Sequence, residues 1–374
     1  MSQRFFVAMT VAAALLFALS SASAAQSKTE ILYVQQNTSL LTYNIDPTTL
    51  QATLVGQPLP RAGYQPYVRV FQSPNGHFIY VLWGPQELQM SVSVYATDSS
   101  GVPQLPALQT IGPAGISDFT IDPKGDFAYL IQYTNNANLE FYYKMWLFSS
   151  NANGVLTKSS KPQITFPPTY YCNPIFEGFY PNASQMQYAW LCPGLDPYTG
   201  TFYSRSVNAQ TGALGSAQVF FSFSDDGFIN GDIVRLGYRS INDWNLNQTQ
   251  MSMKIYSPHN GKTPLIDCNS AMLAACGETN NFWQDATGEY LFLAGSNATE
   301  MVKIDYAAKQ IVDTGYSFDG APVASPDDSV LYGGCTAPGC FQLYGFDPTL
   351  GVVTTGGQFS VAPTVWNIFP AVRD

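Results

Sequence analysis

Short apolar runs separated by turn-forming residues recur along the whole chain. Four of them follow nearly the same phrase, a polar turn that leads into an aromatic or β-branched strand. These phrases are SPNGHFIYVLW (73–83), DPKGDFAYLIQY (122–133), DATGEYLFLAGS (285–296) and SPDDSVLYGGC (325–335). A strand before each turn, such as Tyr67–Phe71, completes a β-hairpin. The pattern predicts one such hairpin in each unit of a repeat.

A second phrase recurs about 20 residues after each of these hairpins. An apolar strand end runs into Asp or Asn, then small polar residues, then a new strand. The polar positions are Asp46, Asp98, Asn151, Asn208, Ser257, Asp305 and Asp347, which lie 42 to 57 residues apart. Asp and Asn suit this place because their side chains accept hydrogen bonds from the backbone two residues on. Each repeat therefore contains four strands, with turns between the first and second and between the third and fourth.

A four-stranded unit of about 50 residues, repeated in series, is typical of a β-propeller blade. The sequence predicts an all-β, seven-bladed propeller of antiparallel blades. Residues 31–36 match a second strand with no first strand before it, and residues 362–374 match a first strand with nothing after it. We therefore expect the N- and C-terminal strands to pair and close the ring, which removes an exposed sheet edge.

The N-terminal residues are typical of an export signal rather than of the fold. Arg4, the apolar-leaning run Val7–Leu19 and the small residues Ala22-Ser23-Ala24 give the three regions of a signal peptide, with cleavage after Ala24 or Ala25. We expect residues 1–24 to be removed and residues 25–374 to form one domain. No later segment is long and apolar enough to span a membrane. The sequence thus predicts a secreted or periplasmic protein.

Composition narrows the choice of partner. The formal net charge is −10, so the chain is expected to repel nucleic acid. Charged residues make up only 11% of the chain and aromatic residues 14%, as expected for short packed strands. The remaining partners are an unknown small molecule, a sugar or an extracellular protein.

Six cysteines in an exported chain favour disulfides over free thiols. In the blade arrangement the neighbours along the chain lie at adjacent strand ends, which predicts the pairs Cys172–Cys192, Cys268–Cys276 and Cys335–Cys340, all on one face of the ring. A metal site is the alternative, but the chain has no C-x-x-C motif and no histidine near these cysteines. We therefore expect no metal and no cofactor.

Some stretches resemble a known family. LYVQQNTSLLTYNID (32–46) and IYVLW (79–83) are similar to YVTN-type repeats, and QPYVRVFQSPNGHFIYV (65–81) resembles a blade of the lactonase-like seven-bladed propellers. The resemblance implies a ligand site at a mouth of the central channel. Members of the family often carry a Pro-His pair at the start of the first strand, with the histidine toward the channel. This chain has Pro66-Tyr67 there, and tyrosine is a poor general base near neutral pH.

The candidate ligand-binding residues lie in the loops of the cysteine-bearing face, which are the longer and more varied ones. They are Arg61, Tyr67, Arg69, Asp118, Asp232, Glu278, Asp319 and Trp366. Arginines suit an anionic group, although Arg69 is equally suited to a structural ion pair. A close pair of carboxylates suits acid–base chemistry or a cation. Aromatic residues such as Tyr170 and Tyr171 suit a sugar, or equally packing between blades. The two histidines, His77 and His259, fall in turns on the opposite face.

Two functions remain open at this stage. The sequence favours an exported β-propeller that binds a ligand or a protein without the usual lactonase chemistry. The alternative is a lactonase-like hydrolase that acts at the channel mouth. The chain carries no G-x-S-x-G, no P-loop and no H-E-x-x-H motif, so no catalytic residue is assigned.

Overall fold

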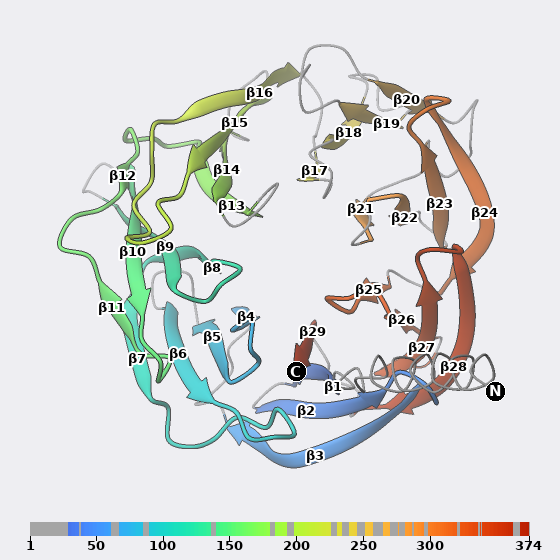
Figure 1. Ribbon diagram of the computed structural model, residues 1–374. Helices are drawn as coiled ribbons and strands as arrows, with labels where there is room; N and C mark the ends of the chain where they lie inside the picture. The colour runs from blue at the N-terminus through green and yellow to red at the C-terminus, as the bar shows by residue number, and fades with distance from the viewer. Residues whose placement is uncertain are drawn as a thin grey trace, which may run out of the picture.

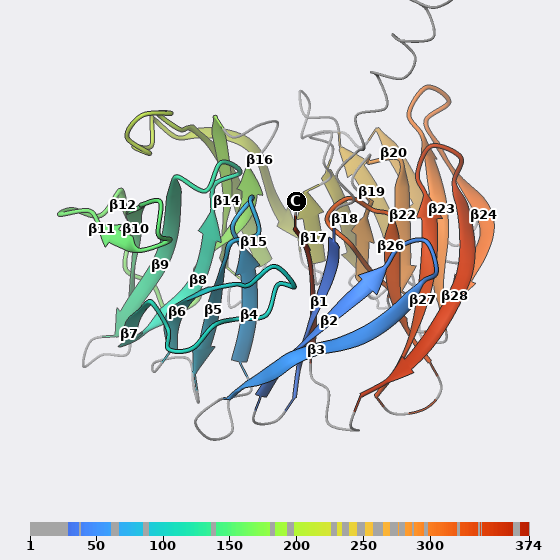
Figure 2. The same ribbon diagram turned by 60° about the horizontal axis from the view of Figure 1, so that its bottom comes forward.

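Small antiparallel β-sheets stand around a central axis like the blades of a propeller in the computed structural model (Figure 1). The sheets are steeply inclined, and their innermost strands line the centre (Figure 2). The described residues are 29–36, 39–60, 67–84, 90–135, 140–179, 184–192, 198–225, 230–233, 239–244, 251–256, 265–269, 276, 281–285, 288–294, 298–319, 322–335, 337, 339–361 and 367–373.

The following sheets, each given from its innermost strand outwards, come from the first half of the chain apart from the C-terminal strand β29. One contains β29 (Asn367–Arg373), β1 (Thr29–Gln35), β2 (Ser39–Asp46) and β3 (Gln51–Pro60). The next contains β4 (Tyr67–Gln72), β5 (Phe78–Gly84), β6 (Met90–Ala96) and β7 (Gln109–Ala114). It is followed by β8 (Ile116–Ile121), β9 (Phe127–Asn135), β10 (Phe141–Ser150) and β11 (Leu156–Lys158), with β12 (Ile164–Thr165) also paired to β10.

The later sheets follow the same order of strands. One contains β13 (Asn173–Phe179), β14 (Gln185–Cys192), β15 (Tyr198–Ser206) and β16 (Gln218–Asp225). The next contains β17 (Asn230–Ile233), β18 (Arg239–Trp244), β19 (Met251–Tyr256) and β20 (Ile266–Asn269). It is followed by β21 (Asn281–Gln284), β22 (Tyr290–Ala294), β23 (Thr299–Asp305) and β24 (Gln310–Phe318). The last contains β25 (Val323–Ala324), β26 (Val330–Gly334), β27 (Cys340–Asp347) and β28 (Val352–Ser360).

The two ends of the chain share one sheet. β29 pairs antiparallel with β1 from Thr29 opposite Arg373 to Gln35 opposite Asn367. The predicted pairing of the terminal strands is therefore confirmed. Its hydrogen bonds give the edge of β1 a partner and join the last part of the chain to the first.

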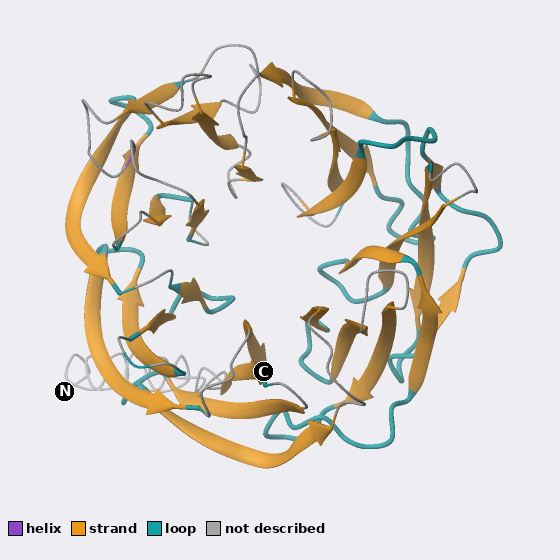
Figure 3. Cartoon of the chain, turned by 180° about the vertical axis from the view of Figure 1, so that it is seen from behind, coloured by secondary structure: helices purple, strands orange, loops and turns teal. Residues whose placement is uncertain are grey.

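Successive strands in each sheet reverse direction, so the turns sort onto two faces of the ring. The turns between first and second and between third and fourth strands lie on one face, here called the turn face. The links between second and third strands, and from one sheet to the next, lie on the other, here called the mouth face. Figure 3 shows the ring from behind, with the strands in orange and the described links and turns in teal.

The first residue of each repeated phrase has the same role on the turn face. Ser73 Oγ accepts a hydrogen bond from Phe78 N at 3.0 Å, and Asp122 Oδ1 accepts one from Phe127 N at 2.7 Å. Asp285 and Ser325 repeat the contact with the backbone N–H five residues on. All four side chains are buried, so each satisfies a backbone donor that water does not reach.

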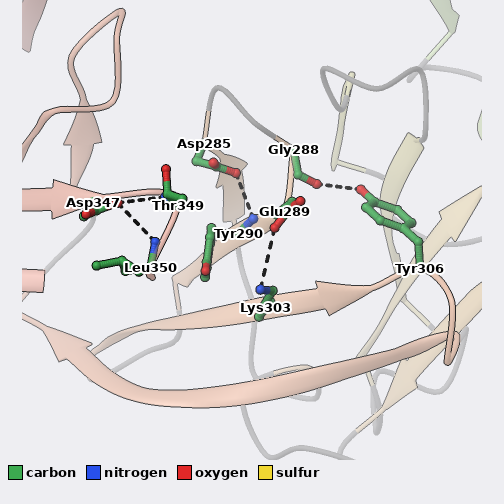
Figure 4. A network of polar contacts seen from close by, with 9 residues as sticks. All are labelled: Asp285, Gly288, Glu289, Tyr290, Lys303, Tyr306, Asp347, Thr349 and Leu350. Atoms are coloured by element: carbon green, nitrogen blue, oxygen red, sulfur yellow. Dashed lines mark hydrogen bonds and ion pairs between the residues drawn. The ribbon is translucent and has the colours of Figure 1, made fainter. Parts of the chain in front are cut away.

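The second repeated phrase also behaves as predicted. The Oδ1 atoms of Asp46, Asp98, Asn151, Asn208 and Asp347 accept a hydrogen bond from the backbone N–H two residues on, at 2.8 to 3.0 Å. Asp305 accepts from the N–H three residues on instead. Figure 4 shows the turn face around Asp285 and Asp347, where Tyr306 also donates to the Gly288 carbonyl oxygen. Ser257 and His259 lie outside the described residues.

Glycines in these turns let neighbouring sheets pack closely. Gly212, in the β15–β16 turn, has φ +67°, and a Cβ there would lie 2.5 Å from the Phe127 ring of the neighbouring sheet. The Tyr129 hydroxyl donates to the Gly212 carbonyl oxygen at 2.6 Å. Gly101 repeats this arrangement with Tyr33, whose hydroxyl donates to it at 2.7 Å. At each of these contacts a glycine, which has no side chain, lets the turn pack directly against the tyrosine-bearing strand of the neighbouring sheet.

The hydrophobic core lies between the sheets rather than within a single layer. Buried side chains of β5 and β6 pack with those of β8 and β9, and those of β22 and β23 pack with β26 and β27. Several of the largest fully buried side chains are tyrosines of the second strands: Tyr33, Tyr80, Tyr129, Tyr290 and Tyr332. Aromatic packing between blades, one of the two interpretations of the aromatic content, therefore accounts for this group.

Candidate functional site

A cavity of about 1070 Å³ lies where the first strands β4, β8 and β13 begin. Its wall includes Arg69, Asp118 and Phe176 from these strands and Phe369 from β29. Arg69, Asp118 and Phe369 are each the third residue of their strand, in the half nearer the mouth face, and Phe176 lies at the middle of β13. The cavity therefore lies toward the mouth face, and its size is that of a site for an organic ligand.

Arg69 and Asp118 form the charged centre of this cavity. Arg69 Nη1 donates to Asp118 Oδ1 at 2.8 Å, although the two residues belong to different sheets. The Arg69 side chain is 60% exposed and the Asp118 side chain only 6%. The guanidinium group is thus held at one end by a buried carboxylate, while the rest of it faces the solvent-filled space.

Asp118 has further partners that fix its position. Its Oδ1 accepts from Phe119 N at 2.9 Å, and its Oδ2 accepts from Phe176 N at 2.8 Å. One carboxylate therefore joins β4, β8 and β13. Burial raises the pKa of Asp118 above its usual range, and the positive charge of Arg69 together with the two backbone donors opposes that rise.

Two β-bulges shape the same wall. The pairing of β8 with β9 shifts register between Ile116 and Asp118, and that of β13 with β14 shifts between Phe176 and Gly178. The extra residues, Ser117 and Glu177, both line the cavity. A bulge re-aims side chains by placing two residues opposite one. The wall therefore gains a hydroxyl and a carboxylate that strict alternation would have placed differently.

Aromatic side chains form the side of the cavity nearest β9, β10 and the β12–β13 link. Tyr133, Phe141 and Tyr143 pack together with ring centroids 5.6 to 6.1 Å apart. Tyr170 and Tyr171 stand at the rim and are 50% and 55% exposed. The cavity thus combines an apolar, ring-lined side with one charged pair.

The backbone that carries these rim tyrosines is held from several directions. Thr169 and Phe141 exchange backbone hydrogen bonds at 2.7 and 3.1 Å. Thr169 Oγ1 accepts from the N–H groups of Tyr171 and Cys172, both at 3.0 Å. Glu140 lies close to this segment and accepts a hydrogen bond from the Tyr142 hydroxyl at 3.1 Å. Desolvation, and then the negative charge of Glu140, raise the pKa of Tyr170, so that its hydroxyl stays protonated.

The three predicted disulfides are present. They join Cys172 to Cys192, Cys268 to Cys276 and Cys335 to Cys340. Cys172 comes just before β13 and Cys192 ends β14, so this bridge closes the cavity rim next to Tyr171. Cys335 and Cys340 lie at the facing ends of β26 and β27, and Cys268 in β20 is joined to Cys276 in the link to β21. These bridges are consistent with an exported protein.

The structure brings together only some of the predicted ligand residues. Arg69 and Asp118 meet, whereas Asp319 is exposed after β24 and does not line this cavity. Tyr67 begins β4 and Asp232 lies in β17, but their side chains are outside the described part. The expectations for Arg61, Glu278 and Trp366 also fall outside the described residues.

Sequence reasoning missed Ser117, Glu177 and the ring cluster around Tyr133. The bulges that expose the first two have no clear mark in the sequence, apart from Gly178, whose φ is +110° and whose missing Cβ would point into open space. His77 lies in the β4–β5 turn, on the turn face, where its N–H donates to Asn75. Trp83 packs against Tyr95 and donates to Ser93, which is a packing role.

The described residues contain neither a cluster of metal-ligating side chains nor a membrane-spanning helix. Nowhere in that part do three or more His, Cys, Asp or Glu side chains gather as a metal ion would need. Nor does any helix within it have the length and apolar character to cross a membrane.

Comparisons with known proteins identify the fold. No family model matches the chain, and no curated protein matches its sequence. Among solved structures, a protein from Bacteroides uniformis proposed to be a 6-phosphogluconolactonase has a TM-score of 0.61 at 13% identity and covers 92% of this chain and 100% of its own. The periplasmic gluconolactonase of Pseudomonas aeruginosa gives 0.58 at 13% identity, covering 91% and 99%.

A hypothetical selenium-binding protein from Sulfolobus tokodaii gives a TM-score of 0.56 at 10% identity, with 94% of each chain covered. Proteins with such different descriptions share the architecture, so the likeness at this level of identity carries the fold and not the chemistry. The chain is an all-β propeller whose structural neighbours include 6-phosphogluconolactonase-like propellers.

Proposed function

We propose that this protein is an exported ligand-binding propeller whose mouth-face cavity takes a neutral, hydroxyl-rich molecule, a carbohydrate. The observation that carries the proposal is the Arg69–Asp118 pair in the ring-lined cavity. Arg69 presents hydrogen-bond donors to the ligand, while the buried Asp118 carboxylate offsets the positive charge of its guanidinium.

The charge balance favours a neutral ligand over an anion. Among the described residues of the wall, Arg69 is the one cation, and it is offset by Asp118 and outweighed once Glu177 is added. The chain as a whole carries a formal charge of −10. An anionic ligand would meet net repulsion, whereas sugar hydroxyl groups can both donate to carboxylates and accept from a guanidinium.

The aromatic side of the cavity supports the same class of ligand. A pyranose ring has an apolar face, which stacks on aromatic rings such as Phe141 and Tyr143 inside the cavity, and a polar edge, which suits Arg69 and Asn173. Binding sites of this kind combine a mostly apolar wall with a few polar groups that set orientation.

The test is a titration of the mature protein with neutral sugars, followed by calorimetry or ligand-observed NMR. Arg69→Met keeps the length of the side chain but removes its donors, and we expect it to weaken binding by about tenfold or more, as for loss of a charge-assisted hydrogen bond. Lys124→Met is the matched control, because it removes an exposed positive charge from the turn face. Equal binding by the Arg69 variant and the control would contradict the proposal, and so would the absence of binding by any sugar.

Hydrolysis of a lactone is the second candidate, supported by the likeness to gluconolactonases and by the position of the cavity. The obstacle is a general base. Asp118 already accepts from three donors, and Tyr67 stands where the resembled family often has a histidine. Turnover of sugar lactones above the spontaneous rate, lost in Arg69→Met and kept in Lys124→Met, would favour the hydrolase over the binding module.

We also propose that the ring has seven blades, that residues 25–374 form one domain, and that residues 1–24 are an export signal. The sheets described above and the pairing of β1 with β29 support the first point. The disulfides, and the periplasmic gluconolactonase among the structural neighbours, support export. Mass spectrometry of the exported protein tests it, since an N-terminus at Ala25 or Gln26 is expected.

A further inference from the structure

We infer that Tyr170 and Tyr171 form a second sugar subsite at the cavity rim, so that the ligand is an oligosaccharide of at least two units and not a single sugar. This inference rests on the proposed carbohydrate site and names its ligand more closely. One sugar occupies the cavity near Arg69, and the next lies against the rim tyrosines.

Exposure of the two rings is the first observation. Among the described residues most large aromatic side chains are packed between sheets, yet Tyr170 and Tyr171 are 50% and 55% exposed and adjacent in the chain. Both line the cavity, and their ring centroids lie 6.1 Å apart at an interplanar angle of 52°. They thus offer two ring faces to a ligand that leaves the cavity.

Hydrogen bonds and a disulfide hold the backbone around Tyr170 and Tyr171, which is the second observation. The backbone pair with Phe141, the two donors to Thr169 Oγ1 and the Cys172–Cys192 bridge hold this short stretch from both ends. Ordering exposed side chains is a main cost of binding, and a preformed segment avoids much of it.

Cavity size is the third observation. Its volume of about 1070 Å³ lies just above the range of ~300–1,000 Å³ that is usual for drug-sized ligands. A single hexose is smaller than a drug-sized molecule and would leave much of this space to water. A chain of two or three sugars fills more of it and reaches the rim.

The experiment compares affinities for glucose, galactose and mannose with those for their di- and trisaccharides. The intact protein is expected to bind at least one oligosaccharide about fivefold more tightly than its monosaccharide, which is the scale of one aromatic contact. Tyr170→Ala and Tyr171→Ala should remove that gain and leave the monosaccharide affinity unchanged. Tyr171→Phe keeps the ring and should keep the gain, and Leu350→Ala, an exposed apolar residue on the turn face, should change neither.

The outcomes separate the two claims. If monosaccharides and oligosaccharides bind equally, or if the gain survives in both alanine variants, the rim subsite is wrong while the cavity site stands. If no sugar binds the intact protein, the proposed function fails, and the subsite with it. Thermal melting of each variant, expected to match the intact protein within experimental error, shows that a lost gain does not come from unfolding.

Discussion

On the turn face, Ser73, Asp122, Asp285 and Ser325 repeat one hydrogen bond in four different sheets, whereas on the mouth face β8 and β13 depart from regular pairing and each expose an extra residue. The repeated contacts join each turn to its own sheet. The irregular ones surround a cavity. The comparison separates the part of the repeat that builds the ring from the part that is free to form a site.

The largest expected effect tests close packing on the turn face. Gly212→Ala should destabilise the protein by roughly 2 to 5 kcal/mol, because a left-handed alanine costs ~1–2 and overpacking against Phe127 adds ~1–3. Gly315 has φ +78° with nothing near its missing Cβ, so Gly315→Ala should cost only the ~1–2 kcal/mol of a left-handed alanine. Urea unfolding measures both, and equal losses would mean that the Gly212 contact contributes nothing.

The next effect concerns the mouth face. Replacing Cys172 and Cys192 together by alanine should cost about 3 kcal/mol, from the ring of 20 residues that the bridge closes, against about 2 for the Cys335–Cys340 pair with its separation of 5. Dithiothreitol should likewise lower the melting temperature while the β signal in circular dichroism stays intact at low temperature. Melting that does not change on reduction would contradict a stabilising role for the bridges.

The smallest effect tests a single turn. The backbone N–H of Thr49, then its side chain, and the N–H of Thr48 lower the pKa of Asp46 below 3.8. The ionised carboxylate therefore stabilises the folded state above pH 3.8, and this contribution is lost as the pH falls through the lowered folded pKa. Asp46→Ala should melt slightly below the intact protein at pH 6, with a gap that narrows below pH 3.8. Asp46→Asn keeps the acceptor and should not show this narrowing; a constant gap in Asp46→Ala would rule out the titration.

Most of the ring could be predicted from the sequence because its determinants are local. Asp46, Asp98 and Asp347 close turns through atoms two residues away, and hairpin spacing alone places the cysteines at adjacent strand ends. The terminal pairing followed from counting strands. Such turn residues recur in each repeat and can be recognised from the sequence alone.

Much less of the site could be predicted, because its determinants are long-range. Arg69 and Asp118 were both candidates, but they lie 49 residues apart, and nothing in either segment shows that they meet. Ser117 and Glu177 reach the cavity only through a one-residue shift of register, which changes the facing of every later side chain in a strand. Tyr170 and Tyr171 could be placed in a loop, but their exposure depends on how Thr169 and Phe141 pair.

The central claim is that the mouth-face cavity, and not the turn face, binds a neutral carbohydrate beside Arg69. A crystal structure of the mature protein soaked with its tightest neutral oligosaccharide tests this most directly. The account predicts sugar density in the cavity, with a hydroxyl group within hydrogen-bond distance of the Arg69 guanidinium and a second ring against Tyr170 or Tyr171. An ordered sugar on the turn face, or an empty cavity at a concentration that saturates binding in solution, would contradict it.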